Sequence, residues 1–479
     1  MNDFYEFNIA KEILLALEKL GYKNPTEVQK KVVPLVLKNK DIIVESQTGS
    51  GKTGAFAIPI CERVEIENSN PQALILTPTR ELAVQIKEDI SNIGRFKKVR
   101  CTAIFGKQVF SSQVRELKQR IHVVVGTPGR TLDHIERGTI NLNGINYLVI
   151  DEADEMLNMG FIDQVKHIIN RLPKKRVTML FSATMSEKIQ TLCHEYMKDP
   201  AVINIKAEKP ITEKIKDYYY IVEGKDKFDL LKKIIYKENP DSAMIFCNTR
   251  NSVETLSSIL IDKGIPCTSI HGGMLQQDRL NVVKSFSRGE FIFLVATDIA
   301  ARGIDIANIT HVINYDLPFE KESYVHRIGR TGRGENSGKA ISFVTPKQLR
   351  FLNEIEEYIG RTIDKGQLPE LRDIETGKNL FNERLKNKPK LKKEKSFELN
   401  KNILKIYINA GKKKKIRNVD IVGTISNING VESGDIGIID IQDNLSYVDI
   451  LNGKGSLVIE ALREKTIKGK KIRCERAEK

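Results

Sequence analysis

Short runs of apolar residues alternate with longer amphipathic stretches along most of the chain. In the first part the apolar runs are DIIVES, ALILTP, TAIFG, HVVVGTP, YLVIDEAD and TMLFSAT, and each ends at small or polar residues. In the second part they are AMIFCNT, TSIHGG, FLVATD, HVINYD and AISFVT. Strands buried on both faces of a parallel sheet have this pattern, and the stretches between them are typical of crossover helices. The pattern predicts two α/β domains, over residues 1–207 and 208–365, joined through the polar segment around Pro210.

A different pattern begins after residue 365. Residues 366–402 are polar and, from 378 onwards, rich in Lys and Asn, which predicts a flexible basic linker. Residues 403–479 then contain ILKIYIN, VDIVGTISNI, IGIIDIQD, YVDIL, SLVIEALREK and KKIRCER. We interpret these as strand, helix, strand, strand, helix and strand. This βαββαβ order is typical of the ferredoxin-like or RRM arrangement.

The positive charge of the protein is concentrated in one segment. The chain of 479 residues has 77 Lys+Arg against 62 Asp+Glu, a formal net charge of +15. Residues 378–417 hold 15 Lys or Arg and 3 Asp or Glu, so +12 lies there, and residues 1–377 carry only +4. A cationic segment of this kind favours a polyanionic partner such as nucleic acid, because binding releases counterions.

Other classes of protein fit the sequence poorly. No apolar run approaches the ~20 residues that span a bilayer, and the start, MNDFYEFNIAKEILL, lacks the basic flank of a signal peptide. The six cysteines are scattered without a CxxC pair, so we interpret them as reduced thiols rather than disulfides or a zinc site. We therefore expect a cytoplasmic protein with no membrane partner.

A Gly-rich segment follows the first predicted strand and precedes a helical stretch. Its residues are Ser46, Gln47, Thr48, Gly49, Ser50, Gly51, Lys52 and Thr53. They fit the phosphate-binding loop, except that Ser46 stands at the position of the first Gly. Backbone N–H groups of such a loop close around nucleotide phosphates, Lys52 adds positive charge, and the Thr53 hydroxyl can hold Mg²⁺. The alternative is a Gly-rich turn that happens to carry a lysine, but the flanking strand and helix favour the phosphate loop.

An acidic tetrapeptide, Asp151-Glu152-Ala153-Asp154, closes the run YLVI. A carboxylate at a strand end beside a phosphate loop can provide the second Mg²⁺ contact, and the next acid can orient and deprotonate the attacking water. Alone, the tetrapeptide is equally typical of a helix start, where acids suit the dipole. Its pairing with the phosphate loop favours the catalytic interpretation. We predict Lys52, Asp151 and Glu152 as catalytic residues, with Thr53 and Asp151 at the metal.

These motifs, with others in the same order, resemble the DEAD-box ATP-dependent RNA helicases over residues 1–360. The segment GYKNPTEVQ is similar to the Q motif of that family, and Phe4 stands at its isolated upstream aromatic. The resemblance implies two RecA-like domains and ATP as the nucleotide. Gln29 would read the adenine edge, and Asp305 would lie near the ribose. The full set it assigns to the nucleotide outside the phosphate loop is Phe4, Tyr22, Thr26, Gln29, Gly303 and Asp305.

The same resemblance implies RNA contacts and a coupling element. The implied RNA-contacting residues of the two α/β domains are Pro78, Thr79, Arg80, Gly106, Thr127, Gly129, Arg130, Thr249, Arg250, Gln276, Arg279, Thr297 and Asp298. Ser182, Ala183 and Thr184 would couple hydrolysis to strand separation. Arg330 and Arg333 of the segment HRIGRTGR would act as catalytic arginine fingers on the γ-phosphate. Since these arginines would come from the other domain, hydrolysis would depend on domain closure.

The C-terminal segments ELNK, IYIN, GKKKKIR, VGTI and ILNGKG are similar to the RNA-binding domain of the DbpA/YxiN subfamily. That resemblance implies a role on 23S ribosomal RNA, through its helix 92, in large-subunit assembly. From the residues themselves, Tyr407 could stack on a base or be a half-exposed strand residue. The basic loop of Lys412, Lys413, Lys414, Lys415 and Arg417 could clamp RNA phosphates or be solvated surface, and its place beside an RNA-binding type of fold favours RNA.

We therefore expect an α/β protein with two RecA-like parallel-sheet domains followed by a small βαββαβ RRM-like domain. The expected function is an ATP-dependent RNA helicase that uses ATP and Mg²⁺, binds large-subunit ribosomal RNA and pre-ribosomal particles, and is a monomer. The alternatives are a general cold-shock or RNA-decay helicase, an ATP-gated RNA clamp or scaffold, and a DNA-directed motor. Deletion of 403–479, a strand-displacement assay and ATPase stimulation by DNA would separate them.

Overall fold

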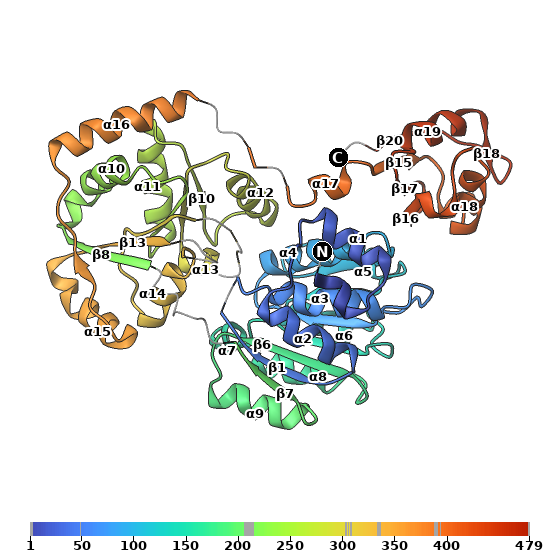
Figure 1. Ribbon diagram of the computed structural model, residues 1–479, viewed down its shortest axis with the longest axis horizontal. Coiled ribbons are helices and arrows are strands. Elements are labelled where there is room, and N and C mark those ends of the chain that lie inside the picture. Colours follow the sequence, from blue (N-terminus) through green and yellow to red (C-terminus); the bar gives the residue numbers. More distant parts are fainter. Residues whose placement is uncertain are drawn as a thin grey trace. The chain divides into compact units, whose positions relative to one another are not determined.

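The computed structural model describes residues 3–47, 49–205, 215–301, 304, 306, 309–332, 337–387, 391–392 and 394–477. Two α/β domains and a small C-terminal domain follow one another along the chain (Figure 1). None of the described helices combines the length and the apolar character needed to span a lipid bilayer.

The first α/β domain contains a parallel sheet of seven strands in the order β3-β4-β2-β5-β6-β1-β7. Its strands are β1 (Ile42–Glu45), β2 (Ala73–Leu76), β3 (Cys101–Ile104), β4 (Val123–Gly126), β5 (Tyr147–Ile150), β6 (Val177–Ser182) and β7 (Ala201–Asn204). Its helices are η1 (Asp3–Phe7), α1 (Lys11–Lys19), α2 (Glu27–Leu37), α3 (Lys52–Arg63), α4 (Arg80–Ile93), α5 (Phe110–Leu117), α6 (Pro128–Glu136), α7 (Ala153–Asn158), α8 (Ile162–Ile169) and α9 (Glu187–Tyr196).

Helices cover both faces of this sheet. α2, α3 and α4 pack side by side, while α6 packs on α8 and α7 on α9 (Figure 1). The chain crosses the sheet in one direction from β1 to β3 and returns from β3 to β7, so right-handed crossovers place the two sets of helices on opposite faces. The strands β2, β4, β5 and β6 are buried along their whole length. Each apolar side chain buried there contributes about 1.5–3 kcal/mol, which makes these strands the core of the domain.

The second α/β domain repeats the arrangement, with a parallel sheet in the order β10-β11-β9-β12-β13-β8-β14. Its strands are β8 (Ile215–Ile221), β9 (Ala243–Phe246), β10 (Cys267–Ile270), β11 (Phe293–Ala296), β12 (His311–Asn314), β13 (Gly338–Val344) and β14 (Asp364–Lys365). Its helices are η3 (Gly224–Asp226), α10 (Lys227–Glu238), α11 (Arg250–Asp262), α12 (Gln276–Ser287), α13 (Asp298–Ala301), α14 (Lys321–Ile328), η4 (Pro346–Gln348), α15 (Leu349–Ile359) and α16 (Leu371–Lys386).

The segment after residue 365 differs from the flexible linker that we expected over 366–402. Residues 371–386 form α16, which packs on α10. Phe381 is 1% exposed and contacts the ring of Tyr236, and Ile374 and Leu385 join the same apolar cluster. Ile374, Phe381 and Leu385 are spaced as on one helix face, but the polar and charged residues between them concealed this spacing in the sequence.

The C-terminal domain has a four-stranded antiparallel sheet in the order β16-β17-β15-β20. Its elements are α17 (Phe397–Asn400), β15 (Leu404–Ile408), η5 (Lys412–Lys414), α18 (Asn418–Ser426), η6 (Ser433–Asp435), β16 (Ile436–Ile441), β17 (Ser446–Ile450), α19 (Gly455–Glu464), β18 (Thr466–Ile467), β19 (Lys470–Lys471) and β20 (Cys474–Arg476). The βαββαβ order is present, with an added hairpin of β18 and β19 before the last strand. The expected fold class, two parallel-sheet domains followed by a small domain of this kind, is confirmed.

Candidate nucleotide and RNA sites

The phosphate loop joins β1 to α3 and ends in a left-handed glycine. Gly51, the residue before α3, has φ of 92°, a conformation that residues with side chains rarely adopt. A Cβ at Gly51 would lie 2.7 Å from Thr26 Oγ1. Lys52 begins α3 and is 8% exposed, and Thr53 follows it. Since N–H groups in the first turn of a helix favour phosphate, the loop has the geometry expected of a nucleotide site.

The loop turns tightly before Gly51. Gly49 has φ of 83°, and the Ser50 hydroxyl donates to Ser46 Oγ at 3.3 Å. Gln47 is half-buried. Thr48 lies outside the described residues.

Gln29 ties the start of α2 to the phosphate loop. Its Oε1 accepts from the Thr26 N–H at 3.0 Å, and its Nε2 donates to the Gly51 carbonyl at 3.2 Å. Thr26 Oγ1 in turn accepts from the Gln29 N–H, which completes a capping box. These bonds leave the amide one N–H and one lone pair, which is what a bidentate contact to an adenine edge requires.

Gly54, the third residue of α3, was not among the predicted site residues. A Cβ at Gly54 would lie 2.6 Å from Gln29 Nε2 and 3.4 Å from the Tyr22 ring. A glycine inside a helix costs about 1 kcal/mol relative to alanine, so its presence in α3 was a signal that a close contact requires it.

The two predicted aromatic residues lie together. Phe4 is fully buried and packs edge-on against the rings of Phe7 and Tyr22, at 5.8 and 6.0 Å between centroids. Burial raises the pKa of the Tyr22 hydroxyl, and the charge of Asp89 raises it further. Phe4 therefore supports Tyr22 from within the core.

The acidic residues after β5 lie at the carboxyl edge of the sheet. Asp151 is 3% exposed, and its Oδ1 accepts from the Glu152 N–H at 3.1 Å. Glu152 precedes α7 with φ of 54°. A left-handed backbone at a residue other than glycine costs about 1–3 kcal/mol, and such strain clusters at active sites, ligand clamps and switch regions.

Asp154, which was not in the predicted set, connects this motif to the predicted coupling residues. Its Oδ2 accepts from the Ala183 N–H at 3.2 Å and from the Thr184 hydroxyl at 3.5 Å. The Ser182 hydroxyl donates to the Thr184 carbonyl at 2.7 Å. The structure therefore brings Ser182, Ala183 and Thr184 into contact with the acidic motif.

The predicted RNA-contacting residues of the first domain follow β2, β3 and β4. Pro78 is buried in the loop after β2, Thr79 caps α4 by accepting from the Leu82 N–H, and Arg80 begins that helix. Gly106 faces the Arg80 guanidinium, since a Cβ there would lie 3.5 Å from Nη2.

The residues after β4 are also held within the domain. Thr127 precedes α6, and a Cβ at Gly129 would lie 3.3 Å from Gln164 Oε1. Arg130 donates to the Gln108 carbonyl at 3.2 Å and to Gln113 Oε1 at 2.8 Å. The Arg130 guanidinium is therefore fixed by its own domain.

The second domain places its predicted residues at the matching strands. Thr249 follows β9 and accepts from the Ser252 N–H at 3.1 Å, and Arg250 begins α11, paired with Glu254 at 2.8 Å. Gln276 and Arg279 lie on α12. Thr297 and Asp298 follow β11.

Arg327, on α14, connects several of these segments and was not in the predicted set. It is 1% exposed and donates to both carboxylate oxygens of Asp298, at 2.5 and 2.7 Å. It also donates to Asn248 Oδ1 at 2.9 Å and to Asn314 Oδ1 at 3.1 Å. The carboxylate of Asp298, which we expected to contact RNA, is thus engaged by Arg327. The guanidinium fixes the loops after β9, β11 and β12 relative to one another.

One of the two predicted arginine fingers can be placed. Arg330 follows α14, and its Nη1 donates to the Ile304 carbonyl at 2.8 Å. Arg333, Gly303 and Asp305 lie outside the described residues.

The strand order divides the carboxyl edge of the first sheet into two halves. The predicted RNA contacts follow β3, β4 and β2, and the predicted nucleotide contacts follow β5 and β1. β6, which ends at Ser182, lies between β5 and β1. The coupling residues therefore emerge between the acidic motif and the phosphate loop, at the edge where open α/β sheets bind ligands.

In the C-terminal domain, Tyr407 lies opposite Tyr447 in a cross-strand pair, with 6.0 Å between ring centroids. The same row across the sheet continues with Asp440 on one side and Glu475 on the other. Paired residues of neighbouring strands share a face. Two carboxylates therefore flank the two rings, and one of them, Glu475, is paired with Arg473 at 2.7 Å.

A cluster of lysines lies elsewhere on this domain. Lys412–Lys414 form η5, and Lys415 adopts a left-handed conformation with φ of 59°. The hairpin of β18 and β19 adds two more lysines, because Lys470 Nζ donates to the Lys414 carbonyl at 2.7 Å and Lys468 Nζ to the Lys415 carbonyl at 3.2 Å. We call Lys412–Lys415, Lys468 and Lys470 the basic cluster; Arg417 lies next to it and approaches Asp420 at 3.6 Å.

Comparisons with known proteins agree with this arrangement. Residues 26–192 match the DEAD/DEAH box helicase family, residues 226–335 the helicase conserved C-terminal domain, and residues 405–476 the DbpA RNA binding domain. The chain is 57% identical to the ATP-dependent RNA helicase DbpA of Bacillus subtilis over all of both chains. It is 44% identical to the DEAD-box ATP-dependent RNA helicase CshA of Geobacillus kaustophilus, covering 78% of this chain and 79% of that one.

A solved structure of Saccharomyces cerevisiae Dbp5 bound to RNA and ADP BeF3 is also similar. Its TM-score is 0.70 at 31% identity, covering 80% of this chain and 100% of that one.

Two parallel α/β domains with these motifs define an RNA-dependent ATPase of the helicase class. The chain belongs to the DEAD-box ATP-dependent RNA helicases and, by its C-terminal domain and its full-length match, to their DbpA type.

Proposed function

We propose that this helicase remodels 23S ribosomal RNA in the region of helix 92, within pre-ribosomal particles, during assembly of the large ribosomal subunit. The observation that carries the proposal is the basic cluster on a domain of the DbpA RNA-binding type. Six lysines gathered from two segments suit a folded RNA whose phosphates come from more than one strand. The relative of the CshA type matches only 78% of the chain, whereas the DbpA relative matches all of it, which favours a target specific to the DbpA type.

The roles of the nucleotide-site residues form part of the proposal. Lys52 and the N–H groups at the start of α3 hold the phosphates, and Gln29 contacts the adenine edge. Glu152 orients the attacking water and accepts its proton, while Arg330 and Arg333 neutralise charge that develops on the γ-phosphate. Asp154 transmits the state of this site to Ser182–Thr184.

The Thr53 hydroxyl and the Asp151 carboxylate would hold Mg²⁺. Both are hard oxygen donors, which this cation prefers. Among the residues that the structure describes, there is no group of three or more His, Cys, Asp or Glu that could hold a metal ion. The two donors therefore fit a cation that completes its shell with nucleotide phosphates and water, and that helps to neutralise the phosphate charge when bound.

ATPase stimulation by defined RNA fragments tests the target. The full chain is incubated with ATP and either a 23S fragment that contains helix 92 or a fragment of equal length and composition without it, over a salt series. We expect half-maximal stimulation at a much lower concentration of the helix 92 fragment. Equal stimulation by the two fragments at every salt concentration would contradict the target.

Charge-neutral variants test the basic cluster. Changing Lys412, Lys413, Lys468 and Lys470 to Gln should raise the concentration of the helix 92 fragment needed for activation at least tenfold and reduce its salt dependence. The maximal ATPase rate should change little, because these lysines lie far along the chain from the ATPase motifs. The control changes four exposed lysines of the second domain to Gln: Lys225, Lys263, Lys347 and Lys365. Equal losses in the two variants would show that only net charge matters.

A monomeric state and a cytoplasmic location remain predictions. Sedimentation of the full chain, and its distribution between the cytosolic and membrane fractions of cells, test them directly.

A further inference from the structure

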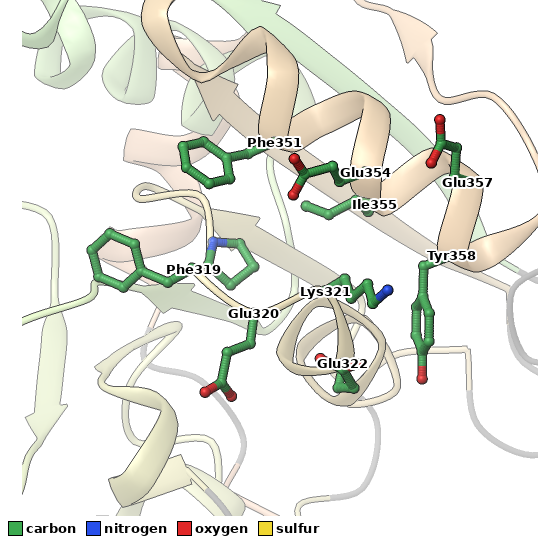
Figure 2. Close-up of a pocket in the computed structure, with 10 residues that line it drawn as sticks. Phe319, Glu320, Lys321, Glu322, Phe351, Glu354, Ile355, Glu357 and Tyr358 are labelled. Carbon is green, nitrogen blue, oxygen red and sulfur yellow. The ribbon is translucent and has the colours of Figure 1, made fainter.

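A groove on the second α/β domain is not used by the proposed RNA or nucleotide chemistry. It has a volume of about 610 Å³ and lies between α14 with its preceding loop and α15 (Figure 2). Phe351, Glu354, Ile355 and Tyr358 line it from α15 at positions i, i+3, i+4 and i+7, which is one face of a helix. Pro318 to Glu322 form the opposite wall. We call these residues, with Glu357, the acidic groove.

Apolar side chains of the groove are exposed to an unusual degree. Phe319 is 77% exposed, Tyr358 47% and Phe351 43%. Figure 2 shows Phe319 and Phe351 projecting from opposite walls, with Ile355 between the two elements. Large apolar residues that cluster in a concave surface mark binding sites more often than scattered ones do.

The charge of the groove is opposite to that of the protein as a whole. Four glutamates line it, at 320, 322, 354 and 357, against a single cation, Lys321. Glu354 pairs with Arg350 at 3.3 Å, whereas in the described part of the chain Glu320, Glu322 and Glu357 form no ion pair. Lys321 Nζ lies 5.2 Å from the centroid of the Tyr358 ring. Of the chain's net charge of +15, +12 lies in residues 378–417, so the protein combines a strongly basic segment with this acidic surface.

The glutamates and the exposed aromatic residues together determine which kind of ligand the groove can bind. Four carboxylates repel nucleic acid and nucleotide phosphates. Carboxylates beside exposed aromatic rings attract Lys and Arg, because a cation gains both ion pairs and contact with the ring face. The exposed phenylalanines add anchor positions for apolar side chains, which a small cation cannot fill.

We propose that the acidic groove docks a Lys- or Arg-rich segment with apolar anchor residues, contributed by a second protein that binds the same RNA. Segments of this composition are typical of RNA-binding proteins, because their cations neutralise phosphates. Within the basic segment of this chain, Lys392 contacts another part of the domain: its N–H donates to the Arg288 carbonyl, after α12, at 2.9 Å. Docking recruits the partner through protein contacts and leaves the basic cluster to the RNA.

Fluorescence anisotropy with the full chain tests the groove. The probe is a fluorescein-labelled synthetic peptide of Lys-Leu-Lys repeats at physiological ionic strength. We expect saturable binding that weakens at least tenfold in the double variant Glu320→Lys, Glu322→Lys and severalfold in Phe319→Ser. Unchanged Kd values in both variants would overturn the proposal.

Two controls separate docking from general charge attraction. The variant Glu375→Lys, Asp229→Lys changes two exposed acids of the same domain outside the groove and should leave the Kd within twofold. A peptide of Lys-Ser-Lys repeats should bind at least fivefold more weakly than the leucine peptide. Equal loss in the control variant, or equal binding of the serine peptide, would show attraction to net charge alone and contradict docking.

A third variant tests whether the chain occupies its own groove. Changing Lys388, Lys390 and Lys392 to Glu should leave the affinity for the leucine peptide unchanged. A clear gain in affinity would mean that this segment competes for the groove, which would overturn the assignment to a second protein.

Discussion

The two α/β domains share one topology but differ at the same position of their sheets. Their strand orders correspond strand for strand, and β8 takes the place of β1. After β1 comes the phosphate loop, and α3 begins with Lys52; after β8, α10 begins with Lys227. Asp151 follows β5, and Asp316 follows the corresponding β12.

In the second domain this lysine and aspartate bind each other, with Lys227 Nζ 2.7 Å from Asp316 Oδ1. The residue before Lys227 is Asp226, which has φ of −98° and so is not left-handed like Gly51. A lysine at the start of the first crossover helix is therefore not sufficient for phosphate binding. We expect phosphate binding only where left-handed glycines such as Gly51 also precede the lysine.

The largest expected effect is on the ATPase rate, and it distinguishes Lys52 from Lys227. Lys52→Ala should lower the RNA-stimulated ATPase rate at least about 100-fold, because a preorganised positive charge at the phosphates is lost, with little change in melting temperature. Lys227→Ala should have the reverse profile: near-normal ATPase per folded molecule and a loss of about 1–3 kcal/mol in the free energy of unfolding, because Asp316 loses its partner. ATPase assays and urea unfolding of both variants check this. A loss of ATPase activity in folded Lys227→Ala equal to that of Lys52→Ala would break the comparison.

The next largest effect is expected on the stability of the second domain, from a change at Arg327. This arginine has no counterpart among the described residues of the first domain, where Asp154 connects the strand ends. Arg327→Lys keeps the charge but loses the fork that binds Asp298, Asn248 and Asn314. We expect the free energy of unfolding to fall by about 1–3 kcal/mol, because buried acceptors such as Asn314 Oδ1 lose their donor. Urea unfolding measures it. The control, Arg350→Lys, alters an arginine that is 89% exposed and should cost under about 0.5 kcal/mol.

Gly54 is the third residue of α3, and Asp229 is the third residue of α10. A change at Gly54 should have a smaller effect, on the kinetic constants of the ATPase. Gly54→Ala places a Cβ against Gln29, which is fixed by two hydrogen bonds and must break at least one to move. We expect the KM for ATP to rise roughly tenfold, about 1.4 kcal/mol, with a smaller change in kcat. Asp229→Ala should leave both constants unchanged. A KM within twofold of wild type for Gly54→Ala would contradict the role of Gln29 at the base.

The smallest expected effect is the change in the free energy of unfolding with pH, which should differ between the two domains. In the first domain, burial lowers the pKa of His122 to about 4. Its Nδ1 accepts from the Arg100 N–H at 2.9 Å, so protonation breaks a hydrogen bond. The unfolded chain takes up this proton near pH 6.5, so the free energy of unfolding falls as the pH drops from 6.5 towards 4, by about 1 kcal/mol at pH 5.5.

In the second domain, the His311 imidazole at 3.5 Å and the Lys339 ammonium at 2.5 Å lower the pKa of Glu238 to about 2. Its stabilisation persists to about pH 4.5 and is lost between there and about pH 2. Hydrogen exchange corrected for intrinsic rates should therefore show β4 amides losing protection before β12 amides as the pH falls from 7 to 5. His122→Gln should remove most of this difference. The opposite order of loss would contradict the assignment.

The strands of the two sheets were predictable where burial on both faces makes the sequence continuously apolar, as in β2, β4 and β5. β7 and β8 were missed because they lie towards the edges and mix buried with exposed residues. The motifs that the family resemblance carries were found because they are contiguous in sequence. Asp154 and Arg327 lie inside two of these motifs, but their roles were not predicted, because those roles depend on partners such as Ala183 and Asp298, each 29 residues away. Lys470 was not predicted because its partner, the Lys414 carbonyl, lies 56 residues away.

The left-handed backbone of Glu152 has a consequence for engineering the enzyme. Glycine adopts φ of 54° without strain, so Glu152→Gly should relieve much of that local cost. The same substitution removes the proposed proton acceptor. A directed-evolution campaign that selects for heat resistance alone would therefore tend to discard the proposed catalytic carboxylate, since natural enzymes retain strained active-site residues at the expense of stability. For this chain, each round of thermal selection needs to be paired with a selection for turnover.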